Sequence, residues 1–177
     1  MCFSSIAGTM INVSAANTPA VFTIGGAEAD AGETVSIDIK YSSAEEANLI
    51  AIAQISLSNA DAVIEGFEFS DSAKAVINTG LSNYDPDTKS IITLFDKAQT
   101  FDGVLGTLQV KVSDNAKDGV ITISAAGSRV QNEGVGEVAS SVENGTITVG
   151  DVAPAGKPAY TIGNAEAKPG ETVNVDI

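Results

Sequence analysis

One segment of this sequence occurs twice, and the repetition sets the size of the folding unit. Residues 23–39 read TIGGAEADAGETVSIDI and residues 161–177 read TIGNAEAKPGETVNVDI, so twelve of the seventeen positions are identical. Self-similarity at a fixed spacing indicates that each copy encodes the same structural unit. The unit therefore ends before residue 161, which leaves room for roughly 130 residues, the size of one ordinary domain.

The repeat divides the chain into four parts. Residues 1–16 are small, apolar and uncharged, and we interpret them as a signal-peptide remnant, with an ordinary terminus as the alternative. Residues 19–149 are the complete unit, and residues 150–160 are a linker of Pro, Gly and Ala. Residues 161–177 are the truncated start of a second repeat. This organisation predicts a secreted protein built from tandem modules.

Within the complete unit, short runs of strand-forming residues are separated by turn residues. Apolar and polar side chains alternate in residues 34–41, which places Val35, Ile37, Ile39 and Tyr41 on one face. Further runs lie at residues 50–58, 62–69, 90–95, 104–112, 119–125 and 146–149. Roughly nine strands without a long amphipathic helix predict an all-β fold, a two-sheet β-sandwich.

Three local features accompany these strands. Gly106 interrupts a strand pattern, which predicts a bulge or a close approach of another part of the chain. Residues 70–76 are compatible with a short helical turn capped by Ser70 or Asp71. Asn144-Gly145 is formally part of a glycosylation sequon, but we interpret it as a hairpin turn.

The composition excludes several classes of function. The chain has no His and one Cys, so a Ser-His-Asp triad, a Cys-His pair and a zinc site cannot be built. With 9 Lys and Arg against 23 Asp and Glu, the net charge of −14 opposes binding to nucleic acid and to anionic membranes. No apolar run approaches the roughly 20 residues of a membrane span. We therefore expect neither an enzyme nor a protein inserted in a membrane.

Several segments, taken in order, resemble the cohesin module of bacterial cellulosomal scaffoldins. The most specific are DGVLGTLQVKV at residues 102–112 and NGTITV at residues 144–149, and the likeness extends over about residues 21–149. The resemblance implies a nine-stranded flattened sandwich with jelly-roll topology. It also implies non-catalytic binding of dockerin modules, borne by enzymes that degrade polysaccharides. The calcium of such a complex belongs to the dockerin, so no cofactor is expected on this chain.

In this family the third, fifth, sixth and eighth strands carry the interface, which identifies candidate residues. If Ile55 and Leu57 face the core, alternation places the neighbouring even-numbered residues outside. The candidates are Ile52, Gln54 and Ser56 on the third strand, Ile91, Thr93 and Phe95 on the sixth, and Thr122 and Ser124 on the eighth, with Arg129 at its end. Ile52, Ile91 and Phe95 would supply the apolar centre of the interface. The alternative is that one or two strand faces are inverted and these apolar residues belong to the core.

Two other functions remain open. A structural spacer or adhesin repeat would fit a wholly polar outer face. A carbohydrate-binding module would share the architecture, but the chain has no Trp and only three Tyr for stacking on sugars. We expect a secreted protein of the bacterial cell surface or cellulosome, monomeric, with strand exchange through residues 161–177 as an alternative.

Overall fold

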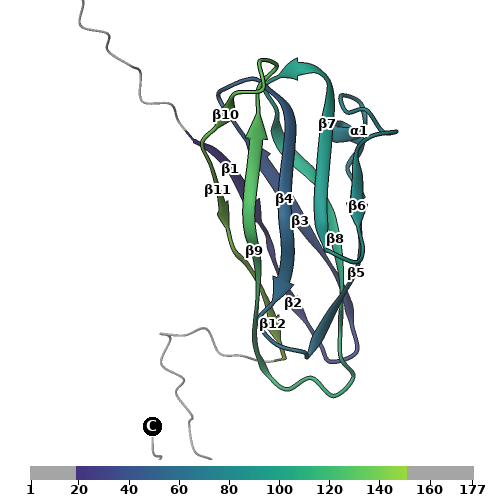
Figure 1. Cartoon of the computed structure of the whole chain (residues 1–177). Coiled ribbons are helices and arrows are strands. Elements are labelled where there is room, and N and C mark those ends of the chain that lie inside the picture. Colours follow the sequence, from purple (N-terminus) through teal and green to yellow (C-terminus); the bar gives the residue numbers. More distant parts are fainter. Residues whose placement is uncertain (1–18, 151–177) are drawn as a thin grey trace, which may run out of the picture.

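Two β-sheets pack face to face in the computed structural model, which describes residues 19–150 (Figure 1). The signal-peptide interpretation of residues 1–16 lies outside the described residues. So do all but the first residue of the linker, the second copy of the repeat at residues 161–177, and the strand exchange expected of that copy. Among residues 19–150, no helix is long and apolar enough to cross a membrane.

The smaller sheet has five strands. In spatial order they are β11 (Ser140–Glu143), β1 (Ala20–Ile24), β3 (Thr34–Ser42), β8 (Asp102–Val112) and β5 (Ala62–Phe69). All neighbours in it are antiparallel except β1 and β11. Its strands form the rear layer in Figure 1.

The larger sheet has seven strands and forms the front layer in Figure 1. Six of them follow in the order β2 (Gly26–Ala29), β12 (Gly145–Val149), β9 (Gly119–Gln131), β4 (Ala47–Leu57), β7 (Ser90–Gln99) and β6 (Asn83–Asp85). The seventh, β10 (Glu137–Val138), pairs with the end of β9. The two-sheet β-sandwich expected from the alternating runs is therefore confirmed.

The structure has more strands than the roughly nine expected, because the first and last strands each pass from one sheet to the other. β1 continues as β2 across Gly25, and β11 continues as β12 across Asn144. β1 runs parallel to β11, and β2 runs parallel to β12. Two parallel two-strand pairs thus close one side of the sandwich.

The hairpin turn predicted at Asn144-Gly145 is wrong, because these residues occupy that passage between the sheets. Gly145 is a buried strand residue, and a Cβ at this position would overlap the carbonyl oxygen of Gly25. The glycine therefore permits close packing of two backbones and does not supply a left-handed turn. A sequence pattern cannot distinguish these two uses of Asn-Gly.

The core lies between the two sheets. On strands whose outer side is polar, the core residues are the apolar ones that the alternating sequence pattern predicts. β3 is the clearest case, since its four apolar side chains are buried and its other residues are exposed. Phe22 on β1 packs against Tyr41 on β3 with ring centroids 4.9 Å apart. Gly106 lies against Phe67, whose ring a Cβ would overlap, so the expected close approach is confirmed.

The expected helical turn is also present, as α1 (Asp71–Lys74). The side chain of Ser70 caps it by accepting a hydrogen bond of 3.1 Å from the backbone N–H of Ala73. The hydroxyl of Ser70 also donates to the carbonyl oxygen of Val104 on β8, at 2.5 Å. The cap therefore anchors the loop between the two sheets to the smaller sheet.

Candidate functional site

A change of alternation within β4 determines which of its residues face outward. Ile50 and Ile52 are buried, and Ile55 is buried again three residues later. The intervening Gln54 has a φ of 39°, in the left-handed region that non-glycine residues rarely adopt. This residue inverts the face that each later side chain of β4 occupies. Gln54 and Ser56 are exposed as predicted, whereas the prediction for Ile52 is wrong.

The predicted orientation of β7 is inverted. Ile91, Thr93 and Phe95 were expected to face outward, but they are 1%, 0% and 2% exposed. Phe95 packs against Phe101 with ring centroids 6.0 Å apart. Ile92 faces outward instead and is 41% exposed. The sequence of this strand is apolar at both even and odd positions, so alternation alone does not distinguish its two faces.

The prediction for the first half of β9 is correct. Ile121 and Ile123 are buried, and Thr122 and Ser124 are half-exposed on the outer face. Ser124 lies opposite Ser56 of β4, with the two hydroxyl oxygens 3.2 Å apart. The two neighbouring strands β4 and β9 thus present small polar groups side by side.

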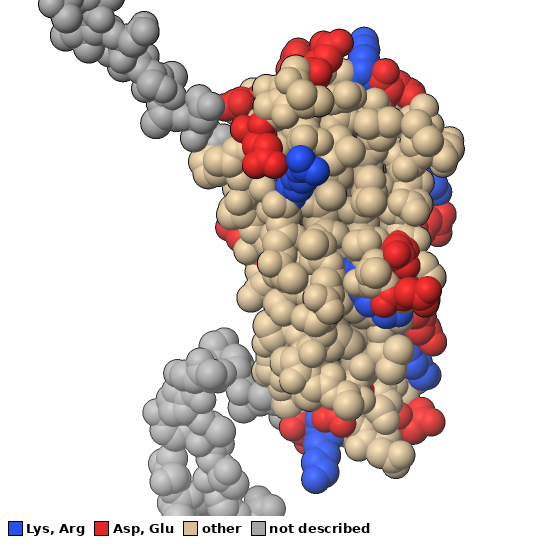
Figure 2. Space-filling view, in the orientation of Figure 1, with Lys and Arg blue, Asp and Glu red and all other residues tan. Residues whose placement is uncertain are grey.

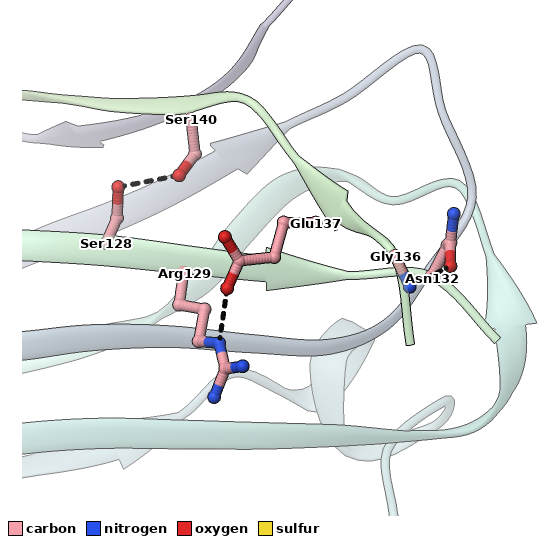
Figure 3. Close-up of polar contacts among 6 residues, drawn as sticks. All are labelled: Ser128, Arg129, Asn132, Gly136, Glu137 and Ser140. Carbon is pink, nitrogen blue, oxygen red and sulfur yellow. Dashed lines mark hydrogen bonds and ion pairs between the residues drawn. The ribbon is translucent and has the colours of Figure 1, made fainter. Parts of the chain in front are cut away.

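Arg129 lies near the far end of β9 and is exposed (Figure 3). Its Nε donates a hydrogen bond of 3.2 Å to a carboxylate oxygen of Glu137 on β10. An exposed ion pair of this kind contributes little to stability because water and salt screen it. It does direct the guanidinium along the outer surface of the sheet. Arg129 was predicted to be available for a partner's carboxylate, and its exposure is compatible with that role.

The outer surface of β9, β4 and the first half of β7 is largely uncharged; the exposed charges of β7 are Asp96 and Lys97, in its second half. β4, β9 and β12 contain no Asp or Glu, and Arg129 is their one charged residue. Figure 2 shows charged side chains gathered at the two ends of the molecule and along one margin, with an uncharged region between them. We refer to the outward residues Ala51, Ala53, Gln54, Ser56, Ile92, Thr122, Ser124, Gly127 and Arg129 as the uncharged face. On a chain with a net charge of −14, this face is the exception.

A shallow hollow of about 290 Å³ lies in the uncharged face. Across the three strands Ala51 stands opposite Ile92 on one side and Arg129 on the other, and Ala53 stands opposite Gly127. Small residues thus lie between larger neighbours. The hollow is lined by Ala51, Ile52, Ala53, Ser90, Ile92, Gly127, Ser128 and Arg129.

Sequence reasoning missed Ala51, Ala53, Ile92 and Gly127 as members of this face. The change of alternation in β4 explains Ala51 and Ala53, and the inverted orientation of β7 explains Ile92. Gly127 carried a usable signal, since a glycine within a strand is unfavourable unless something requires it.

The perturbed titrating groups lie elsewhere and have structural causes. The N–H of Asp87 donates to the carboxylate of Asp85 at 2.8 Å and lowers its pKa, with help from Thr88. Burial raises the pKa of Tyr41. Among residues 19–150, no cluster of three or more His, Cys, Asp or Glu is arranged to hold a metal ion. None of these groups forms a pair of acid and base beside the hollow.

Several solved structures with a similar fold are cohesins. The third ScaB cohesin of R. flavefaciens, in complex with a group 1 dockerin, superposes with a TM-score of 0.65 at 20% identity, covering 78% of this chain and 99% of that one. The sixth cohesin of Acetivibrio cellulolyticus scaffoldin B, in complex with a mutant Cel5 dockerin, gives 0.61 at 17% identity, covering 75% and 100%. The described unit has the cohesin fold.

A similar fold is also found in a cohesin that is not cellulosomal. A non-cellulosomal cohesin from the hyperthermophilic archaeon Archaeoglobus fulgidus gives a TM-score of 0.59 at 15% identity, covering 76% of this chain and 93% of that one. No protein-family model and no curated protein matches this chain. In the cohesin fold of this chain, the expected third, sixth and eighth strands are β4, β7 and β9, which are neighbours in one sheet.

Proposed function

We propose that the described unit is a non-catalytic protein-interaction module that binds dockerin modules through its uncharged face. The observation that carries the proposal is this face on a strongly acidic protein. Protein interfaces have a core depleted in charge within a polar rim. The uncharged face supplies such a core, and the charged ends of the sandwich supply the rim.

The fold supports the same proposal. Several solved structures that share it were determined as complexes of a cohesin with a dockerin. β9, β4 and β7 are adjacent, and their long strands form a continuous surface for a folded partner. Carbohydrate binding is less well supported, because every aromatic side chain among residues 19–150 is buried or half-buried and none is presented as an open stacking platform.

The burial of the first copy of the repeat supports tandem modules. Of the five positions at which the copies differ, Gly26, Asp30, Ala31 and Ser36 are exposed in the first copy. The fifth, Ile37, is buried and corresponds to Val175 in the second copy. The second copy therefore keeps an aliphatic side chain at each position that is apolar and buried in the first. We propose that residues 161–177 begin another module of the same fold.

The turn between β2 and β3 gives independent support. Gly32 has a φ of 82°, and the N–H of Glu33 donates to the carbonyl oxygen of Asp30 at 3.1 Å, as in a type II turn. Proline is favoured directly before the glycine of such a turn. The second copy has Pro169-Gly170 where the first has Ala31-Gly32. The parent protein is accordingly proposed to be a secreted, multi-module scaffold at the bacterial cell surface or in a cellulosome.

The proposal is tested by titrating the full chain with a panel of dockerins in calorimetry, with calcium and with a chelator. Tight binding of at least one dockerin that disappears on chelation is the expected result. Absence of binding across the panel contradicts the proposal. In that case retention on insoluble polysaccharide would indicate a carbohydrate-binding module, and no retention would indicate a structural spacer.

A further inference from the structure

Gly127 lies in the interior of β9 without an internal reason to be glycine. Its φ is not in the left-handed region, and no atom lies within 4 Å of the position that a Cβ would occupy. Gly66 on β5 has an equally open Cβ position, but it lies where the register of β5 against β8 shifts, as at a β-bulge. Four other glycines of the described residues also have local reasons. Gly32 and Gly150 have positive φ, and side chains at Gly106 and Gly145 would overlap neighbouring groups.

Glycine within a strand is unfavourable, since it gains conformational freedom on unfolding and leaves no side chain to pack. A glycine within a strand often marks a bulge, a tight bend or a place that a ligand or another backbone approaches closely. β9 keeps a single register against β4 on both sides of Gly127, so no bulge accounts for this glycine. Gly127 lines the hollow of the uncharged face. The missing side chain and the hollow therefore occupy the same place.

The charges around the hollow restrict what can occupy it. It contains no carboxylate, and its one charge, Arg129, is engaged through Nε with Glu137. An ammonium seated against Ala51, Ala53 and Gly127 would lose its hydration without gaining a counter-charge there. An apolar side chain would lose only water, and would contact Ile92 on one side of Ala51.

Arg129 adds a second point of recognition. Among the described residues, only its Nε makes a hydrogen bond, so its terminal NH₂ groups remain available at the edge of the hollow. A guanidinium presents five donors in a fixed plane, which suits a carbonyl or carboxylate acceptor. The pair with Glu137 holds the guanidinium of a residue that lines the hollow.

We propose that the hollow receives one apolar anchor side chain of the dockerin, with a hydrogen-bond acceptor of the dockerin placed against Arg129. This inference rests on the proposed function and specifies its chemistry. Gly127 is then the specificity-determining position, because any side chain there occupies the space of the anchor.

A graded series at Gly127 tests the proposal in the full chain, with a dockerin that binds the wild type in calcium. Gly127→Ala should weaken binding about threefold and Gly127→Val at least tenfold, since overfilling a packed site is costly. Gly127→Val should keep or raise the melting temperature, because valine favours strands and the Cβ position is open. Loss of affinity therefore cannot come from loss of the fold.

Gly66 provides a matched control. It lies on β5 of the smaller sheet, has no atom within 4 Å of its Cβ position, and is far in sequence and topology from the hollow. Gly66→Val should leave affinity within twofold of the wild type. Arg129→Met, which keeps the aliphatic stem, should weaken binding about fivefold, since it removes the donors to the dockerin's acceptor.

The outcomes separate this inference from the proposed function. If the wild type binds no dockerin, the proposed function fails and this inference fails with it. If the wild type binds and the Gly127 series is flat, or Gly127→Val binds more tightly, only the apolar anchor is overturned. A graded loss at Gly127 with an unchanged Gly66→Val supports it.

Discussion

The outer surfaces of the two sheets differ although both enclose the same core. On the smaller sheet, polar groups are paired with one another. Nζ of Lys74 lies 2.8 Å from a carboxylate oxygen of Glu68, and the hydroxyl of Thr107 donates to Asp38 at 3.3 Å. On the larger sheet, the uncharged face has little internal pairing beyond Ser56 with Ser124 and Arg129 with Glu137.

Under the proposed function, this difference distinguishes a surface adapted to water from one adapted to a partner. Charged groups on the smaller sheet cost nothing to leave solvated and keep the protein soluble. A face that must be dehydrated on binding is better without charges, because each unpaired charge would add a desolvation cost. The core does not require this distinction, since both inner faces are equally apolar.

The largest effect expected concerns the orientation of β7, which decides which residues belong to the uncharged face. Phe95→Ala should lower the free energy of unfolding by about 3–5 kcal/mol, as for a buried aromatic residue. Ile92→Ala should cost about 0.5 kcal/mol or less, as for a surface position. Chemical denaturation measures both. Equal losses of stability in the two variants would mean that Phe95 does not face the core while Ile92 faces solvent.

The second effect concerns charge on the two outer faces. Ala53→Lys should weaken dockerin binding about 100-fold, because the ammonium would be dehydrated without a counter-charge. Ser36→Lys is the control and should bind normally. Ser36 is exposed on β3, on the same outward side as Asp38. Calorimetry measures both affinities. Weakening by Ser36→Lys would place the interface on the smaller sheet.

A third effect separates the core from the interface on β7. The hydroxyl oxygen of Thr93 is buried and has no hydrogen-bond partner among the described residues. Thr93→Val should therefore raise the free energy of unfolding by about 1 kcal/mol while leaving dockerin affinity unchanged. A change in affinity without a gain in stability would mean that Thr93 contacts the dockerin, as the sequence predicted.

The smallest effect concerns the paired charges of the smaller sheet. Lys74 lowers the pKa of the Glu68 carboxyl, mainly through their hydrogen bond. A lowered pKa in the folded state stabilises it above the ordinary pKa of glutamate, and this contribution is lost as the pH falls through the lowered value. Carboxyl titration by NMR should show the pKa of Glu68 returning upward in Lys74→Met. Dockerin binding should be unaffected; a loss would implicate this face.

Where the sequence predicted orientation correctly, the two sides of a strand differ in polarity. β3 alternates Val35, Ile37 and Ile39 with Ser36 and Asp38, so its inner face was evident. β7 has Ile91 and Ile92 side by side, and neither position carries a charge. The absence of charge that makes the larger sheet suitable for binding also removes the contrast from which orientation is predicted.

The remaining errors in predicted orientation come from backbone geometry that cannot be predicted from the residue types involved. A left-handed φ at Gln54 inverts the rest of β4, although glutamine gives no signal for that conformation. The passage of the last strand between sheets at Asn144-Gly145 depends on contact with Gly25, about 120 residues earlier in the chain. The fold class was predictable because it depends on many strands, whereas each site residue depends on one local orientation.

The parallel pairing of the first and last strands determines how the module would carry a mechanical load. Ala20 is paired with Ser140 where β1 begins, and Ala29 with Val149 where β12 ends, so the chain enters and leaves at opposite ends of two parallel pairs about 30 Å long. Tension applied through the two sides of the chain would pull β1 and β2 against β11 and β12 along their length. Their hydrogen bonds would then be sheared together instead of unzipped one at a time, which makes the closing strands of this sandwich a force-bearing element.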